Sequence, residues 1–231
     1  MLNLKVIIMV TFKSFYLPLL YSLLFVSCIQ DDIVYSCDEE TDMWIKENLV
    51  EIQVFTRNDW KEFDPVRKKG VYNAFTPKQK IQFWLDKMKE IKQLDWNKKE
   101  ILHIQKVEDY IHSHKVIFDS ESRNQNDMDD MEIFFYKWKE YALNELGWSL
   151  ETIYNIAATG ESINVSKNSA NTSGESGSFN PDANNDCNCN TGSSISCFPA
   201  GGYCDKARCD KTTHGCGWLW VSECNGRCGG F

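Results

Sequence analysis

The carboxyl-terminal segment from Cys187 to Phe231 holds eight of the ten cysteines of the chain. Ordering so short a segment costs roughly 1.5 kcal/mol per residue, and its apolar area is too small to offset that cost. A disulfide in a small secreted domain contributes about 2–5 kcal/mol, so four bridges have the required magnitude. The sequence therefore predicts a disulfide-rich module over residues 187–231. Its cysteines are Cys187, Cys189, Cys197, Cys204, Cys209, Cys216, Cys224 and Cys228.

A zinc site is the alternative use of these thiols, since closely spaced cysteines also supply metal ligands. The segment has no pair of cysteines separated by two residues, and His214 is its one histidine. An export signal at the start of the chain would place the thiols in an oxidising compartment. We therefore expect disulfides, and neither a metal ion nor another cofactor. The pairing stays open, because the spacing does not decide which cysteines join.

The run Trp218-Leu-Trp-Val221 predicts a short strand in this segment, with both indoles on one face. That face either packs on the cystines as a small core or stays exposed as an aromatic patch for a membrane interface or a receptor. Basic side chains slightly outnumber acidic ones here, although the whole chain has a net charge of -8. The candidate target contacts are Trp218, Trp220, Lys206, Arg208 and Lys211.

Residues 1–27 are apolar with two lysines and predict a secretory signal peptide, which starts at Met1 or at Met9. The alternative for this stretch is a retained membrane anchor. Its end, Phe25-Val-Ser-Cys28, resembles a bacterial lipobox. Cys28 is therefore the candidate lipidation site, where acyl chains would anchor the exported protein.

Residues 28–37 would form a mature amino-terminal tether, and its acidic pair Asp31-Asp32 resembles the surface-export tags of Bacteroidetes lipoproteins. Acylation of Cys28 would leave Cys37 unpaired beside the eight carboxyl-terminal cysteines. Without acylation, a disulfide between Cys28 and Cys37 would close a small loop. The mass of the mature amino terminus distinguishes the two forms.

Residues 38–160 place apolar side chains at spacings of three and four, the pattern of amphipathic helices, and predict an α-helical domain with its own core. Pro77, Asn97 and Ser149 mark predicted helix starts, and Gly147 marks a predicted helix end. The expected fold class is mainly α, with short β-strands in the disulfide-rich segment. The expected helices cover residues 43–55, 76–91, 97–111, 130–146 and 149–160.

The helical stretch offers no evident catalytic chemistry. The chain lacks a nucleophile elbow, a phosphate loop and a metalloprotease helix motif. His112 and His114 would point about 200° apart on a helix, so we do not expect them to form a metal site with His103. The acidic run Asp127–Glu132 lacks the glycine and distal glutamate of a calcium loop and favours a helix amino terminus. Mixed surface charges argue against a nucleic-acid partner. We expect a protein that is not an enzyme.

Residues 161–186 are dense in serine, asparagine, glycine and aspartate, and predict a polar, disordered linker. Such an exposed backbone is a preferred site of proteolysis. The linker is therefore either a plain tether or a processing site that frees the cysteine-rich segment.

The order of signal, helical carrier, polar linker and eight-cysteine segment resembles the fulvocin C-related bacteriocin proteins of Bacteroidetes. Cys187–Phe231 is similar to the mature bacteriocin fulvocin C in length and cysteine content. This resemblance implies four disulfides and the killing of related bacteria. We therefore expect an exported antibacterial precursor, secreted or displayed on the outer membrane. Its expected partners are the envelope or a receptor of the target cell, a processing protease and, through Cys28, the membrane of its own cell.

Two other functions fit the same pattern. The first is a surface lipoprotein whose cysteine-rich segment is never released and serves in binding or adhesion. The second is a small enzyme inhibitor, because disulfide-dense scaffolds often present a protease-binding loop. A small fragment in the medium that begins near Asp186 would favour the released antibacterial peptide over the surface module.

Overall fold

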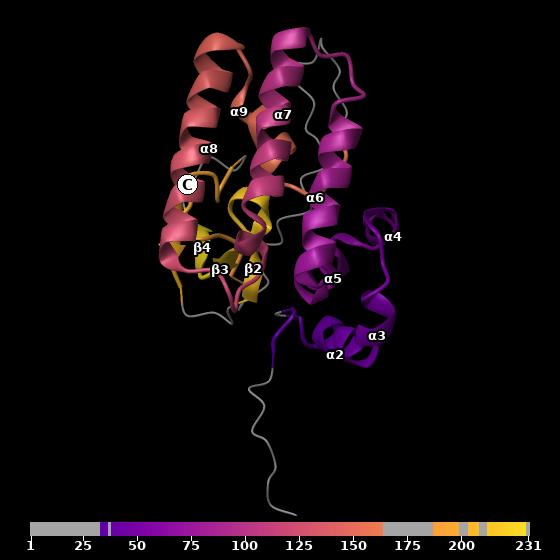
Figure 1. Cartoon of the computed structure of the whole chain (residues 1–231). Coiled ribbons are helices and arrows are strands. Elements are labelled where there is room, and N and C mark those ends of the chain that lie inside the picture. The colour runs from indigo at the N-terminus through magenta and orange to yellow at the C-terminus, as the bar shows by residue number, and fades with distance from the viewer. Residues whose placement is uncertain (1–32, 37, 164–186, 199–202, 208–211, 230–231) are drawn as a thin grey trace, which may run out of the picture. The chain divides into compact units, whose positions relative to one another are not determined.

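Figure 1 shows the helices and strands of the chain. Local capping signals in the sequence set where the main helices begin. α6 (Pro77–Ile91) follows Thr76 and α7 (Lys98–Ser113) follows Asn97, each with a capping box. These boxes satisfy backbone amides that have no partner inside the helix. Both predicted starts are confirmed. The computed structural model describes residues 33–36, 38–163, 187–198, 203–207 and 212–229.

Side-chain caps also set where the last two helices begin. α8 (Gln125–Glu145) begins earlier than predicted, because Asn124 and Asp127 form a capping box ahead of the expected start. Gly147 then adopts a φ of 66°, the conformation of a glycine that ends a helix. α9 (Leu150–Ala157) begins after Ser149, whose side chain caps it as predicted.

The chain before α6 is more broken than predicted, since one helix was expected over residues 43–55 and none between there and Thr76. Thr56 and Asp59 form a capping box, and Asp64 caps a helix that begins with proline. These signals are local and could have been read from the sequence. The helices are α2 (Glu39–Glu47), α3 (Leu49–Ile52), α4 (Arg57–Lys61) and α5 (Pro65–Ala74), and a 3-10 turn, η2 (Lys115–Phe118), follows α7.

The cysteine-rich segment, called the tail from here on, forms two small antiparallel sheets. The predicted mainly α fold with a short-stranded, disulfide-bonded tail is confirmed. The outer sheet pairs β1 (Tyr203–Lys206) with β4 (Gly226–Gly229). The inner sheet pairs β2 (Thr212–Cys216) with β3 (Ser222–Cys224). A 3-10 turn, η3 (Trp218–Trp220), joins the strands of the inner sheet, so the strand predicted over these tryptophans is wrong.

The tail shares its core with the helices. The described residues from Val34 onward belong to one compact unit, and one apolar cluster contains side chains of both parts. Trp218, Leu219 and Val221 have no exposed area within that cluster. The expected division into a helical domain with a core of its own and a separate tail is therefore corrected. Long-range packing joins segments that the sequence separates.

The first three residues of the predicted linker, 161–163, belong to the described structure. Glu161 forms an ion pair with Lys68 at 3.0 Å, and Ile163 packs against the shared core. Residues 164–186 lie outside the described residues, as do the predicted signal peptide, Cys28 and Cys37. None of the helices in the described part of the chain has the length and apolar character needed to cross a bilayer.

Candidate functional site

The candidate site is the seat in which the helices hold residues Gly217–Val221, which we call the tryptophan loop. Its first indole, Trp218, lies flat against Phe135 of α8, with ring centroids 4.7 Å apart and planes 7° apart. Trp138 lies edge-on to the same indole, with ring centroids 6.4 Å apart. Because Trp218 is fully buried, its side chain is part of the helical core and not of the tail's surface.

The second indole, Trp220, enters an aromatic box on the helical side. The rings of this box lie 5.1–6.3 Å from the Trp220 ring, three of them edge-on and one stacked. Aromatic pairs of this kind contribute about 0.5–1.5 kcal/mol each beyond the burial of area. The indole nitrogen of Trp220 also donates to the carbonyl of Ala158 at 2.9 Å. The box consists of Trp60, Tyr72, Phe83 and Trp84.

Gly160 lets the chain pass directly under this box. A Cβ atom at this position would lie 2.7 Å from Phe83, 2.8 Å from Trp60 and 3.0 Å from Trp220. Arg57 donates to the carbonyl of Gly160 at 2.9 Å. The carbonyl before it, of Thr159, accepts from Lys87, a buried lysine of α6. The end of the helical part is thus fixed against α4 and α6, directly beside Trp220.

Side chains of the helical part also hold the main chain of the tryptophan loop. The Tyr72 hydroxyl donates to the carbonyl of Leu219 at 3.0 Å and accepts from the indole of Trp84 at 3.0 Å. Arg123 donates to the carbonyl of Val221 and, at 3.0 Å, to that of Thr213. Buried carbonyls need such partners, because leaving one unpaired costs about 1–3 kcal/mol.

The backbone conformation of the tryptophan loop costs conformational free energy. Leu219 and Trp220 have φ values of 50° and 52°, in the left-handed region that side chains other than glycine rarely adopt. The cost is about 1–2 kcal/mol for each residue. The contacts with the helices therefore oppose an intrinsic preference of the loop for another conformation.

Buried basic side chains line the seam between α6 and β2. The Lys80 ammonium donates to the carbonyl of Asn73 and to Nδ1 of His214, both at 3.2 Å. Burial, reinforced by the charge of Arg123, lowers the pKa of Lys80 to about 7. Burial and the charges of Lys80 and Arg123 lower the pKa of His214 to about 2, so this histidine is neutral at pH 7. The seam is therefore well packed and electrostatically unfavourable.

A carboxylate of α8 contacts the tail on the other side of the loop. The Ser194 hydroxyl donates to Glu132 at 3.4 Å. Burial raises the pKa of Glu132, and hydrogen bonding from Ser194 opposes that rise. The seat thus holds the tail from α5, α6 and α8 at once.

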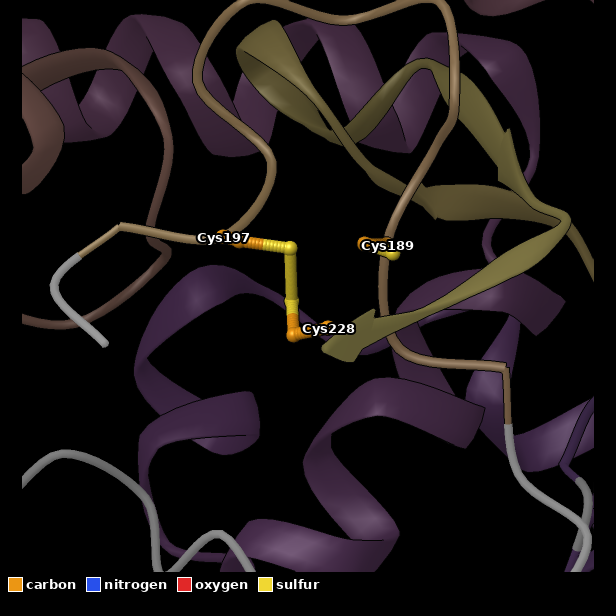
Figure 2. Close-up of side chains that lie close together, drawn as sticks. All are labelled: Cys189, Cys197 and Cys228. Atoms are coloured by element: carbon orange, nitrogen blue, oxygen red, sulfur yellow. A yellow bond between two sulfur atoms is a disulfide. The ribbon is translucent and has the colours of Figure 1, made fainter. Parts of the chain in front are cut away.

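The expected disulfides form among the described cysteines. Figure 2 shows the Cys197–Cys228 bond beside Cys189, and the sulfurs of these three residues lie within 4.8 Å of one another. The Cys189 sulfur is bonded to the Cys204 sulfur, so all three sulfurs take part in disulfide bonds. None of the three is therefore a thiolate that could bind a metal ion. Cys187 is also disulfide-bonded, whereas Cys209 lies outside the described residues. The described bonds are Cys189–Cys204, Cys197–Cys228 and Cys216–Cys224.

The structure separates the predicted target contacts. Trp218 is buried and Trp220 is half-buried, so the intact chain does not present the exposed aromatic face that was one of the two expected arrangements. Both indoles pack on aromatic side chains of the helices instead. The two indoles also enter different parts of the helical core, because the loop is a turn and not a strand. Lys206 is exposed on β1, while Arg208 and Lys211 lie outside the described residues.

The sequence did carry a signal for the missed residues of the seat. Lys80 and Lys87 lie on the same face of α6 as Trp84 and Ile91, at helical spacing. A lysine within an apolar stripe indicates a buried contact with polar groups elsewhere in the chain. By contrast, His103 is buried against Trp138, whose carbonyl lies 2.9 Å from Nε2, and burial lowers the histidine's pKa to about 4.

Comparisons with known proteins return no matching protein-family model, no matching curated protein and no matching solved structure. The resemblance to fulvocin C-related proteins therefore stays a prediction from the residues of the tail.

Proposed function

We propose that the chain is an exported antibacterial precursor in which the helices mask the apolar loop of a disulfide-stapled tail. The observation that carries this proposal is the burial of Trp218 and Leu219 in the helical part, beside a half-buried Trp220 that packs against the same core. A separated tail would expose these side chains. Indoles suit a membrane interface or a receptor groove because one end is apolar and the other donates a hydrogen bond. The masked form would then be inactive and the separated tail active.

The disulfides support persistence of the tail after separation. The described bonds lie within the tail, and one of them joins residues 31 positions apart in the sequence. Closing a loop of that length stabilises a folded form by about 3–4 kcal/mol. The outer sheet, with Lys206 already exposed, does not depend on the seat for its strand pairing.

The test compares three forms of the same chain against a panel of related bacteria. These are the intact oxidised protein, the protein cut at a protease site inserted within residues 164–186, and the oxidised peptide 187–231. We expect growth inhibition by the peptide and at least tenfold weaker inhibition by the intact protein. A correctly oxidised peptide that is inactive across a broad panel would overturn the proposal.

A second candidate is a surface-anchored protein whose tail is never released and serves in binding. The shared core favours it, because Trp218 stacks on Phe135 as an ordinary core residue would. In that case the exposed outer sheet, including Lys206 and Tyr203, is the binding face. The anchor would be an acylated Cys28.

Cell fractionation separates the two candidates. A full-length species in the membrane fraction, with no small fragment in the medium, favours the surface protein. A fragment that begins near Asp186 favours the antibacterial precursor. Intact mass with and without reduction reports acylation, cleavage and disulfide number in the same samples.

A further inference from the structure

The seat recognises the tryptophan loop by its own contacts. On the helical side, the aromatic box surrounds Trp220 and Phe135 stacks on Trp218. Tyr72 and Arg123 bind main-chain carbonyls of the loop and of β2. None of these contacts passes through residues 164–186. Cutting the chain there leaves every one of them chemically intact.

Other features of the seat weaken its binding of the tryptophan loop. Leu219 and Trp220 adopt positive φ values, and the ammonium of Lys80 is buried against a neutral His214. The covalent connection makes rebinding intramolecular, and such a connection gives an effective concentration in the millimolar range. Once the connection is cut, rebinding becomes a reaction between two separate fragments.

We propose that the seat is a binding site for the tail of a second copy of this chain, and that cut molecules exchange tails with one another. The partner that fits is a loop with two indoles that enter separate groups of aromatic rings and with carbonyls at the positions of Leu219 and Val221 that accept hydrogen bonds from the seat. If the proposed antibacterial function holds, on which this consequence rests, a vacated helical part would capture free tail and protect the cell that makes it.

The experiment uses the full chain with a protease site inserted within residues 164–186. Cys28→Ser and Cys37→Ser are included, so that no disulfide can join the amino-terminal segment to the tail. One preparation is labelled with ¹⁵N and one is not. Both are oxidised, cut, mixed in equal amounts without reductant and followed by size exclusion and native mass spectrometry.

We expect hybrid complexes, in which a labelled tail sits on an unlabelled helical part, to become as abundant as the parental ones. Tyr72→Phe should speed the exchange by about thirty-fold, since two buried partners lose their hydrogen bonds. The matched variant Tyr136→Phe, which changes an exposed tyrosine of α8, should leave the rate unchanged.

Two results would overturn the proposal. One is a cut complex that keeps its own tail throughout the incubation while remaining folded. The other is a pair of fragments that separate and do not recombine on concentration. Neither depends on bacterial killing, so an inactive peptide 187–231 combined with hybrid formation would reject the antibacterial function and leave the exchange standing.

Discussion

The outer and inner sheets of the tail are stabilised in different ways. β1 of the outer sheet exposes Tyr203 and Lys206, and disulfides tie both strands of that sheet to the start of the tail. β2 of the inner sheet is mostly buried, and the short bridge Cys216–Cys224 closes its turn. Disulfides tie the outer sheet to the start of the tail, whereas the inner sheet has one disulfide of its own and also packs into the core of the helices.

This difference shows how a short cysteine-rich segment can carry large apolar side chains. A module of this size has too little interior to bury two indoles by itself. The two indoles instead pack against the helices, and disulfides stabilise the strands at the surface. Changes in the seat should therefore affect the inner sheet, and changes in the outer cysteines should affect the outer sheet.

The largest effect is expected from Trp218→Ala. Removing a fully buried indole should lower the free energy of unfolding by about 3–5 kcal/mol, because it leaves a cavity against Phe135. Trp220→Ala is the matched variant and should cost less, since that indole is half-buried. Urea denaturation of the oxidised proteins measures both. Equal and small losses would show that the loop is not part of the helical core.

The double variant Cys197→Ser/Cys228→Ser tests the outer sheet. Opening this loop should cost about 3–4 kcal/mol and expose the amides of β1 and β4 to hydrogen exchange. Protection in β2 and β3 should persist because Tyr72 and Arg123 still bind the inner part. Loss of protection in both sheets together would contradict the division between them.

Tyr72→Phe probes the main-chain contacts of the seat. The carbonyl of Leu219 and the indole of Trp84 would both lose a buried partner, for a loss of about 2 kcal/mol in unfolding free energy. Tyr136→Phe on the exposed face of α8 should change it by less than about 0.5 kcal/mol. A Tyr72→Phe protein as stable as the parent would show that the Tyr72 hydroxyl does not stabilise the fold.

Acidification should loosen the inner sheet through His214. In the unfolded chain the imidazole gains a proton near pH 6.5, whereas in the folded chain it stays neutral down to about pH 2. Unfolding therefore becomes easier as the pH falls below 6.5, by about 2 kcal/mol between pH 7 and pH 5. His214→Gln should flatten this part of the pH profile. Parallel profiles for parent and variant would show that His214 does not titrate as described.

The smallest effect on stability is expected from Lys206→Ala. The side chain is exposed on β1, so the unfolding free energy should change by less than about 0.5 kcal/mol. If the outer sheet meets the target, growth inhibition by the peptide 187–231 should nevertheless weaken several-fold. Unchanged inhibition would remove Lys206 from the candidate contacts.

The sequence predicted the helices far better than the seat. Thr76, Asn97 and Ser149 specify helix starts through neighbours two or three residues away. The place of Trp220 depends on residues more than a hundred positions earlier, which no local pattern encodes. The alternation of Trp218 and Trp220 predicted a strand, but tertiary contacts hold the loop in positive φ values that override this preference.

Native-state amide hydrogen exchange on the intact, oxidised chain tests most directly whether the inner sheet belongs to the helical core. The parent should be compared with Phe135→Ala, which weakens the seat without changing the tail. We predict that protection in β2 and β3 falls together with that in α8, while protection in β1 and β4 stays as it was. Unchanged protection in β2 and β3, or an equal loss in all four strands, would show that the inner sheet is not stabilised separately by the helical core.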